Sequence, residues 1–211
     1  MTKPVLAIDI DDVLYPFSKH FLMYANEKLG QNKTLTDMVS YRLDTLYSVS
    51  YLEIIDLLKD FMNEAFIMDL EPLPDSVAAI KLLHKQYDLQ IITARLSAYR
   101  EITERWIDKY FPNLFSDMHY CDYYALSPKN SSKTTKLEVC KKIGARCLID
   151  DNPDNVAQAM SGGVMGILFG EYAWHSELPE DCHPTRMASW TDALKKDLWL
   201  ITVHKIKKEK K

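Results

Sequence analysis

The chain has 211 residues, 47% of them hydrophobic, which is enough to bury one sizeable core. Its net charge is −4, from 26 basic and 30 acidic residues, so composition gives no general attraction for nucleic acid or for an anionic membrane. We therefore expect no nucleic-acid or membrane partner, and any phosphate that the protein binds must be held by a local site.

Two further features favour a cytoplasmic protein. The apolar run after Lys3 is interrupted by Asp9, so it is too short for a secretory signal or a membrane span. The four cysteines have neither CxxC pairing nor metal-finger spacing, and we expect reduced thiols.

Apolar segments alternate with helical patterns along most of the chain. Short apolar segments that end in polar residues are typical of buried parallel strands. These segments are residues 4–8, 89–92, 146–149 and 164–169. Helical patterns lie between them at residues 75–85, 98–110 and 135–143. The alternation predicts an α/β fold, a Rossmann-like core of three layers with a mostly parallel sheet.

Residues 18–72 break this alternation, because they offer helical patterns only. We interpret them as an all-helical cap inserted after the first strand, with residues 1–17 and 73–200 as the core. The alternative is that these helices belong to the core itself. Residues 201–211 form a basic tail, expected to be solvated, to which no function is assigned.

The ends of the predicted strands carry the chemistry. In an open α/β sheet, ligands bind outside the carboxyl ends of the strands. The first strand ends at Asp9, Asp11 and Asp12, and a later one ends at Asp150 and Asp151. Carboxylates that converge on one crevice repel one another unless a cation lies among them, and oxygen-only ligands favour Mg²⁺. An ionised Asp9 could attack phosphorus, and Asp11 could exchange protons with the leaving oxygen and with water.

In order and position, these motifs resemble those of the haloacid-dehalogenase-like phosphatases. Residues 5–14 are similar to the family's strand followed by Asp-x-Asp-x-(Thr/Val)-Leu. The resemblance implies that Asp9 is the nucleophile and Asp11 the acid/base. It also implies that the side chain of Asp9 and the backbone carbonyl of Asp11 bind Mg²⁺.

Residues 91–93 resemble the family's second motif, in which a hydroxyl at the strand end holds a phosphate oxygen. Thr93 and Ala94 fit this role. Arg95 is not part of the family motif, and two roles stay open for it: a phosphate or substrate contact, or a surface salt bridge.

The third and fourth motifs imply a lysine and a pair of acids. Lys133 and Lys136 compete for the lysine, and we favour Lys136 because it opens the helix before the acidic strand, after a cap at Thr134 or Thr135. Residues 147–151 match the family's apolar strand that ends in metal-binding acids. Asp151 is the expected direct ligand, and Asp150 is expected to bind directly or through water. Asp154 and Asn155 could support the water shell of the metal.

Within this superfamily the chain most resembles the 5′(3′)-deoxyribonucleotidase, or 5′-nucleotidase type C, group. Residues 9–17, 93–95, 172–174 and 186–190 carry that resemblance. It implies a nucleoside monophosphate as substrate, with Phe17 in the base pocket, although Phe17 could instead seal the hinge of the cap. Asp12 replaces the glycine that is common in the family. A phosphatase or phosphotransferase for another small phosphate ester, and a non-catalytic phosphate-binding protein, are the alternatives.

Overall fold

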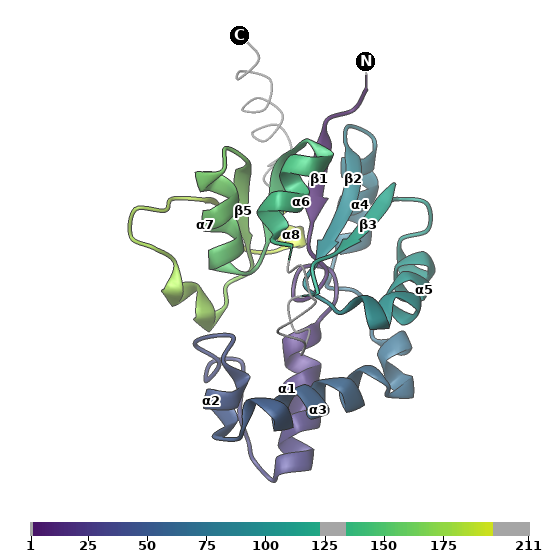
Figure 1. Cartoon of the computed structure of the whole chain (residues 1–211). Coiled ribbons are helices and arrows are strands. Elements are labelled where there is room, and N and C mark those ends of the chain that lie inside the picture. Colours follow the sequence, from purple (N-terminus) through teal and green to yellow (C-terminus); the bar gives the residue numbers. More distant parts are fainter. Residues whose placement is uncertain (1, 123–133, 196–211) are drawn as a thin grey trace.

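A parallel sheet forms the centre of the molecule. The computed structural model describes residues 2–122 and 134–195. In this part of the chain the sheet has six strands in the order β3-β2-β1-β4-β5-β6, and every pairing is parallel (Figure 1). The strands are β1 (Val5–Ile8), β2 (Asp88–Thr93), β3 (Asp117–Tyr120), β4 (Ala145–Asp150), β5 (Met165–Phe169) and β6 (Thr185–Met187). The predicted Rossmann-like α/β fold is therefore confirmed.

Both faces of the central strands are buried. Leu6 and Ile8 of β1 belong to one apolar cluster, and Ala7 between them belongs to the other, because alternate side chains of a strand point to opposite faces. This burial explains why four strands could be predicted from apolar runs. The edge strands β3 and β6 are short and mostly polar in sequence, so they gave no such run.

Helices cover both faces of the sheet. On one face lie α6 (Lys136–Ile143) and α7 (Pro153–Ser161) (Figure 1). On the other lie α4 (Ser76–His84) and α8 (Trp190–Lys195). Helix α5 (Arg100–Tyr110) adds Trp106 to the cluster on that second face. The predicted helices therefore exist, with ends that differ by a few residues.

The segment between β1 and α4 is helical, and its helices lie beyond the carboxyl ends of the strands (Figure 1). It contains α1 (Phe17–Leu29), α2 (Leu43–Tyr47), α3 (Tyr51–Met62) and the 3₁₀ helix η1 (Ala65–Asp69). Helix α3 begins with a capping box in which the Ser50 hydroxyl accepts the Glu53 N–H. Aromatic rings of α1 and α3 pack against one another, including Phe21 and Phe61 at 5.5 Å between centroids. We call residues 18–72 the cap segment; its action as a cap stays a prediction.

The cap segment is tied back to the core at its end. The Leu73 N–H donates to the Leu14 carbonyl at 2.8 Å, and Trp106 Nε1 donates to the Leu70 carbonyl at 2.8 Å. The tail at residues 201–211 and Lys133 lie outside the described residues. Among the helices in the described ranges, none has the length and apolarity that a membrane crossing requires.

Candidate active site

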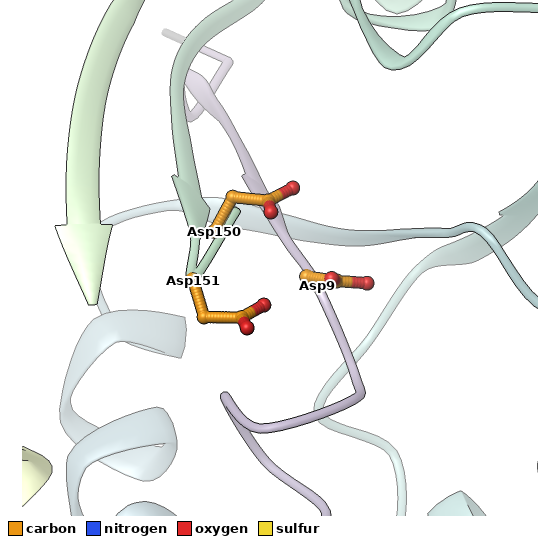
Figure 2. Close-up of side chains that lie close together, drawn as sticks. All are labelled: Asp9, Asp150 and Asp151. Atoms are coloured by element: carbon orange, nitrogen blue, oxygen red, sulfur yellow. The ribbon is translucent and has the colours of Figure 1, made fainter. Parts of the chain in front are cut away.

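Three buried carboxylates meet where β1 and β4 end. Asp9 follows β1, Asp150 ends β4 and Asp151 follows it. Since β1 and β4 are hydrogen-bonded neighbours, their ends lie side by side. One carboxylate oxygen of each aspartate lies within 4.8 Å of those of the other two, and the side chains point into the same space (Figure 2). Three of the five predicted acids thus converge, whereas Asp11 pairs with Arg95 and Asp12 accepts hydrogen bonds from Ser18.

Burial makes this cluster electrostatically costly. Loss of solvent raises the pKa of Asp9 to about 7, and the nearby Asp150 adds to this rise, although Lys136 opposes it. Burial also raises the pKa of Asp151 well above its ordinary value, with the charges of Asp12, Asp150 and Asp9 contributing. A divalent cation among these oxygens would remove the repulsion, so the donor set fits the hard, oxygen-binding ion that the sequence predicted.

Lys136 supplies the positive charge that the structure shows in this cluster. Its Nζ lies 2.6 Å from Asp9 Oδ2 and 2.7 Å from Asp150 Oδ2, and its side chain is 4% exposed. These two carboxylates raise the pKa of Lys136 although burial opposes the rise. Thr135 caps α6 by accepting the Glu138 N–H at 3.1 Å, and this cap fixes the first turn that carries Lys136. Lys136 therefore lies where the motif lysine was expected.

Asp150 and Asp151 are held differently. Asp150 Oδ1 accepts the Asn152 N–H at 2.9 Å and the Asn155 amide at 3.2 Å, while its other oxygen binds Lys136. The Asp151 side chain accepts a hydrogen bond from the Tyr41 hydroxyl. Asp150 is thus largely committed to protein donors, whereas Asp151 keeps one oxygen without a protein donor among the described residues. Asp154 is exposed, and its N–H donates to the Asn152 side chain that caps α7.

Sequence reasoning missed the residues that fix Asp151. Tyr41 comes from the cap segment, and its ring packs against Trp174 at 5.4 Å between centroids. Trp174 Nε1 donates to the Asp151 carbonyl at 3.2 Å, and His175 Nε2 lies 2.9 Å from the same oxygen. A lone tyrosine in a helical insertion carries no signal of such a contact. Tyr172 and Trp174 contribute to the group resemblance, but nothing in the sequence indicates these contacts.

Asp12 occupies a strained turn that binds the cap segment. Its φ of 55° lies in the left-handed region, which glycine adopts more readily than other residues. The Asp12 carboxylate accepts the Ser18 N–H at 3.0 Å and also the Ser18 hydroxyl, near the start of α1. Tyr172 donates to the Asp12 carbonyl at 2.7 Å. The hydrogen bonds of the Asp12 carboxylate thus join this turn to the start of α1.

Thr93 lies at the end of β2, beside the end of β1. The register pairs Ile8 with Ile91, so Asp9 and Thr93 leave the same edge of the sheet. Thr93 is buried, and its Oγ1 accepts the Arg95 N–H at 3.2 Å across the turn through Ala94. This turn follows a parallel strand at the edge where ligands bind, as the phosphate motif requires.

Arg95 forms an ion pair, although not at the surface. Its Nη2 lies 2.7 Å from Asp11 Oδ1, and its side chain is 5% exposed. The surface salt bridge considered from sequence is therefore wrong in its location.

Phe17 begins α1 and is half-buried. Its ring stacks on Phe21 at 5.7 Å and meets Phe61 edge-on at 5.6 Å. Both ring contacts are with residues of the cap segment, so the base-pocket role and the hinge-sealing role both stay predictions.

Comparison with known proteins gives the family. The model of the family described as "5' nucleotidase, deoxy (Pyrimidine), cytosolic type C protein" matches residues 3–204. This chain belongs to that 5′-nucleotidase family. A curated protein of Bacillus subtilis (strain 168), "Putative nucleotidase YqfW", is 27% identical over 191 residues, which are 90% of this chain and 91% of that protein.

Solved structures show the same fold as this nucleotidase-family chain. A haloacid dehalogenase-like hydrolase of Streptococcus pneumoniae has a TM-score of 0.63 and 13% identity, over 92% of this chain and 98% of that one. An HAD-hydrolase of Bacillus subtilis bound to magnesium has a TM-score of 0.57 and 14% identity, over 96% of this chain and 99% of that one. Family membership and the acidic cluster together identify a phosphatase of the 5′-nucleotidase type.

The carboxylate cluster predicts how pH and Mg²⁺ affect stability. Because the pKa of Asp9 is about 7 when folded and 3.8 ordinarily, the stabilising proton is fully held below about pH 4 and is lost as pH rises through about 7. The metal-free nucleotidase should therefore become less stable over that range. Mg²⁺ should raise the melting temperature more at about pH 8 than at about pH 5, because protons and metal compete for the same oxygens.

Thermal denaturation with and without Mg²⁺ measures this difference. Asp151→Asn should remove most of the Mg²⁺ shift, whereas Asp56→Asn, which alters an exposed carboxylate on α3, should leave it unchanged. An equal Mg²⁺ shift at both pH values would contradict the assignment of the cluster as the metal site.

Proposed function

We propose that this phosphatase hydrolyses small phosphate monoesters with Mg²⁺, through a phosphorylated Asp9, and that nucleoside monophosphates are its substrates. The observation that supports this most is the meeting of Asp9, Lys136, Asp150 and Asp151 in one buried cluster.

The contacts of the Asp9 carboxylate are suited to a nucleophile. Its Oδ1 accepts the Ile10 N–H at 2.8 Å, and its Oδ2 faces Lys136 at 2.6 Å. These contacts fix the orientation of the carboxylate, and Lys136 favours its ionised form against the effect of burial. An oriented, ionised carboxylate can attack phosphorus, release the alcohol and divide the hydrolysis into two displacements.

The other roles agree with the same geometry. Thr93 and the N–H groups of the turn at Ala94 would hold the oxygens of the phosphoryl group, and Lys136 would offset the charge that gathers on them. Asp11 would give a proton to the leaving oxygen and later accept one from water. Asp9, Asp151 and the Asp11 carbonyl would hold Mg²⁺, with Asp150 binding directly or through water. The ion would supply charge stabilisation to the phosphoryl oxygens.

The position of the cap segment supports a small substrate. Residues 18–72 lie over the carboxyl ends of the strands, where the acidic cluster lies (Figure 1). A segment in this place excludes water around the transferring group and hinders access by a macromolecule. Phe17 at the start of α1 would offer a ring face to a nucleobase. We assign the nucleoside monophosphate from family membership, and the relative named as a nucleotidase is in keeping with it.

A substrate panel tests this function. Release of phosphate from nucleoside monophosphates should exceed release from sugar phosphates, and it should need Mg²⁺. Asp9→Asn should lower turnover by about three orders of magnitude or more, because it removes the nucleophile. Substantial turnover by that variant would reject the covalent mechanism. Preference for sugar phosphates would keep the mechanism and replace the substrate.

A second comparison tests the assignment of the lysine. Lys136→Ala should lower kcat about a hundredfold or more, since it removes a charge aimed at the reacting group. Lys133→Ala should leave kcat close to that of the unaltered enzyme. Circular dichroism of both variants checks that they are folded. The reverse pattern of activities would move the motif lysine to Lys133.

A further inference from the structure

Arg95 is a buried, charged side chain near the cluster, and the superfamily motif does not include it. Its guanidinium gives three hydrogen bonds to the Asp11 carboxylate: Nε to both oxygens at 3.1 Å, and Nη2 to Oδ1 at 2.7 Å. Nη1 donates to the Thr103 hydroxyl on α5 at 3.2 Å. The guanidinium carbon lies 4.6 Å from the centroid of the Tyr15 ring.

The partners behind Arg95 are rigid. Thr103 and Tyr15 are both 0% exposed. Tyr15 also meets Trp106 edge-on at 4.9 Å, so packing fixes its ring. Asp11 differs because its side chain is 24% exposed. The guanidinium is thus a fixed fork, and the bidentate pairing transfers its orientation to the more exposed carboxylate.

We propose that Arg95 is a positioning residue that aims the Asp11 carboxylate at the water that hydrolyses phosphorylated Asp9. This inference rests on the proposed function, because it needs the covalent intermediate. Asp11 Oδ1 receives two of the three hydrogen bonds from Arg95, and Oδ2 receives one. Oδ2 therefore has more capacity left to accept a proton.

The step is a displacement by water. The water oxygen bonds to phosphorus, the bond from phosphorus to the Asp9 oxygen breaks, and its electron pair returns to Asp9 as carboxylate. Asp11 Oδ2 takes one proton from the attacking water. The products are orthophosphate, ionised Asp9 and protonated Asp11, whose proton is available for the leaving oxygen of the next substrate.

A direct contact with the substrate phosphate is the rival role for Arg95. The geometry disfavours it, because three of the five N–H groups of the guanidinium already have acceptors on Asp11 or Thr103, and the side chain is 5% exposed. A phosphate would have to reach the remaining N–H groups of a buried side chain. The two roles predict different kinetics.

Stopped-flow measurement with p-nitrophenyl phosphate and Mg²⁺ separates the roles. Its leaving group needs no proton donor, so Arg95→Gln should form the phosphoryl-enzyme at a nearly unchanged rate. Hydrolysis of the intermediate should slow about tenfold or more. The variant should then give a burst of one p-nitrophenol per active site, and kcat and KM should fall together with kcat/KM conserved. Acid quench and intact-mass measurement should find the phosphoryl group on the enzyme.

Matched variants complete the test. Thr103→Val removes only the hydroxyl behind the guanidinium and should shift kcat and KM in the same way, by less. Arg100→Gln is the control, because Arg100 also pairs with a carboxylate and lies over an aromatic ring, but is exposed on α5. It should leave all constants unchanged.

Other outcomes would overturn the inference. A fall in kcat/KM with weaker inhibition by orthophosphate would assign Arg95 to phosphate binding. If the amplitude of the p-nitrophenol burst and kcat fell by the same factor while KM stayed unchanged, the variant would simply contain less folded enzyme. If Asp9→Asn remained active, or no variant carried a phosphoryl group, the proposed mechanism itself would fail.

Discussion

The site contains three buried carboxylates, and one buried ammonium group lies beside two of them. The rest of the structure depends on this excess of negative charge. Lys136 lies within 2.7 Å of both Asp9 and Asp150, yet Asp151 completes the cluster without a cationic partner among the described residues. Burial raises the pKa of Asp9 and Asp151, which means that the folded protein holds these charges at a cost. In the proposed mechanism, the divalent cation and the attacking carboxylate would use the same oxygens. The electrostatic cost would then favour binding of the cation.

The strands, one helix and the cap segment together bring the charged residues of the site to one edge of the sheet. Neighbouring parallel strands bring Asp9 and Asp150 to one edge, and a capped helix carries Lys136 to them. The cap segment reaches the same edge through Tyr41, which binds Asp151, and through the link between Asp12 and Ser18. Tyr15 and Thr103 set Arg95 behind Asp11. The residues around the cluster are therefore fixed by the packing of distant parts of the chain.

Local patterns in the sequence were enough to predict the central strands and the acids at their ends. Apolar runs indicated the four central strands, and the acids and the threonine that end them indicated the site. Lys136 was favoured because it opens a helix; its ammonium does lie between Asp9 and Asp150, and its role as the motif lysine stays a prediction. The polar edge strands β3 and β6 gave no periodic signal. The contacts of Tyr41 and Arg95 could not be predicted either, because they join residues 110 and 84 positions apart and depend on how the cap segment and α5 pack.

A crystal structure of the enzyme with Mg²⁺ and beryllium fluoride tests the central claim most directly. Beryllium trifluoride on an aspartate oxygen resembles an aspartyl-phosphate, so it reports which carboxylate accepts the phosphoryl group. We expect beryllium trifluoride to be bonded to an oxygen of Asp9, with one Mg²⁺ bound to Asp9 and Asp151. The ammonium of Lys136 should contact one of the fluorine atoms. An adduct on another residue, or a metal ion bound away from Asp9 and Asp151, would contradict the mechanism.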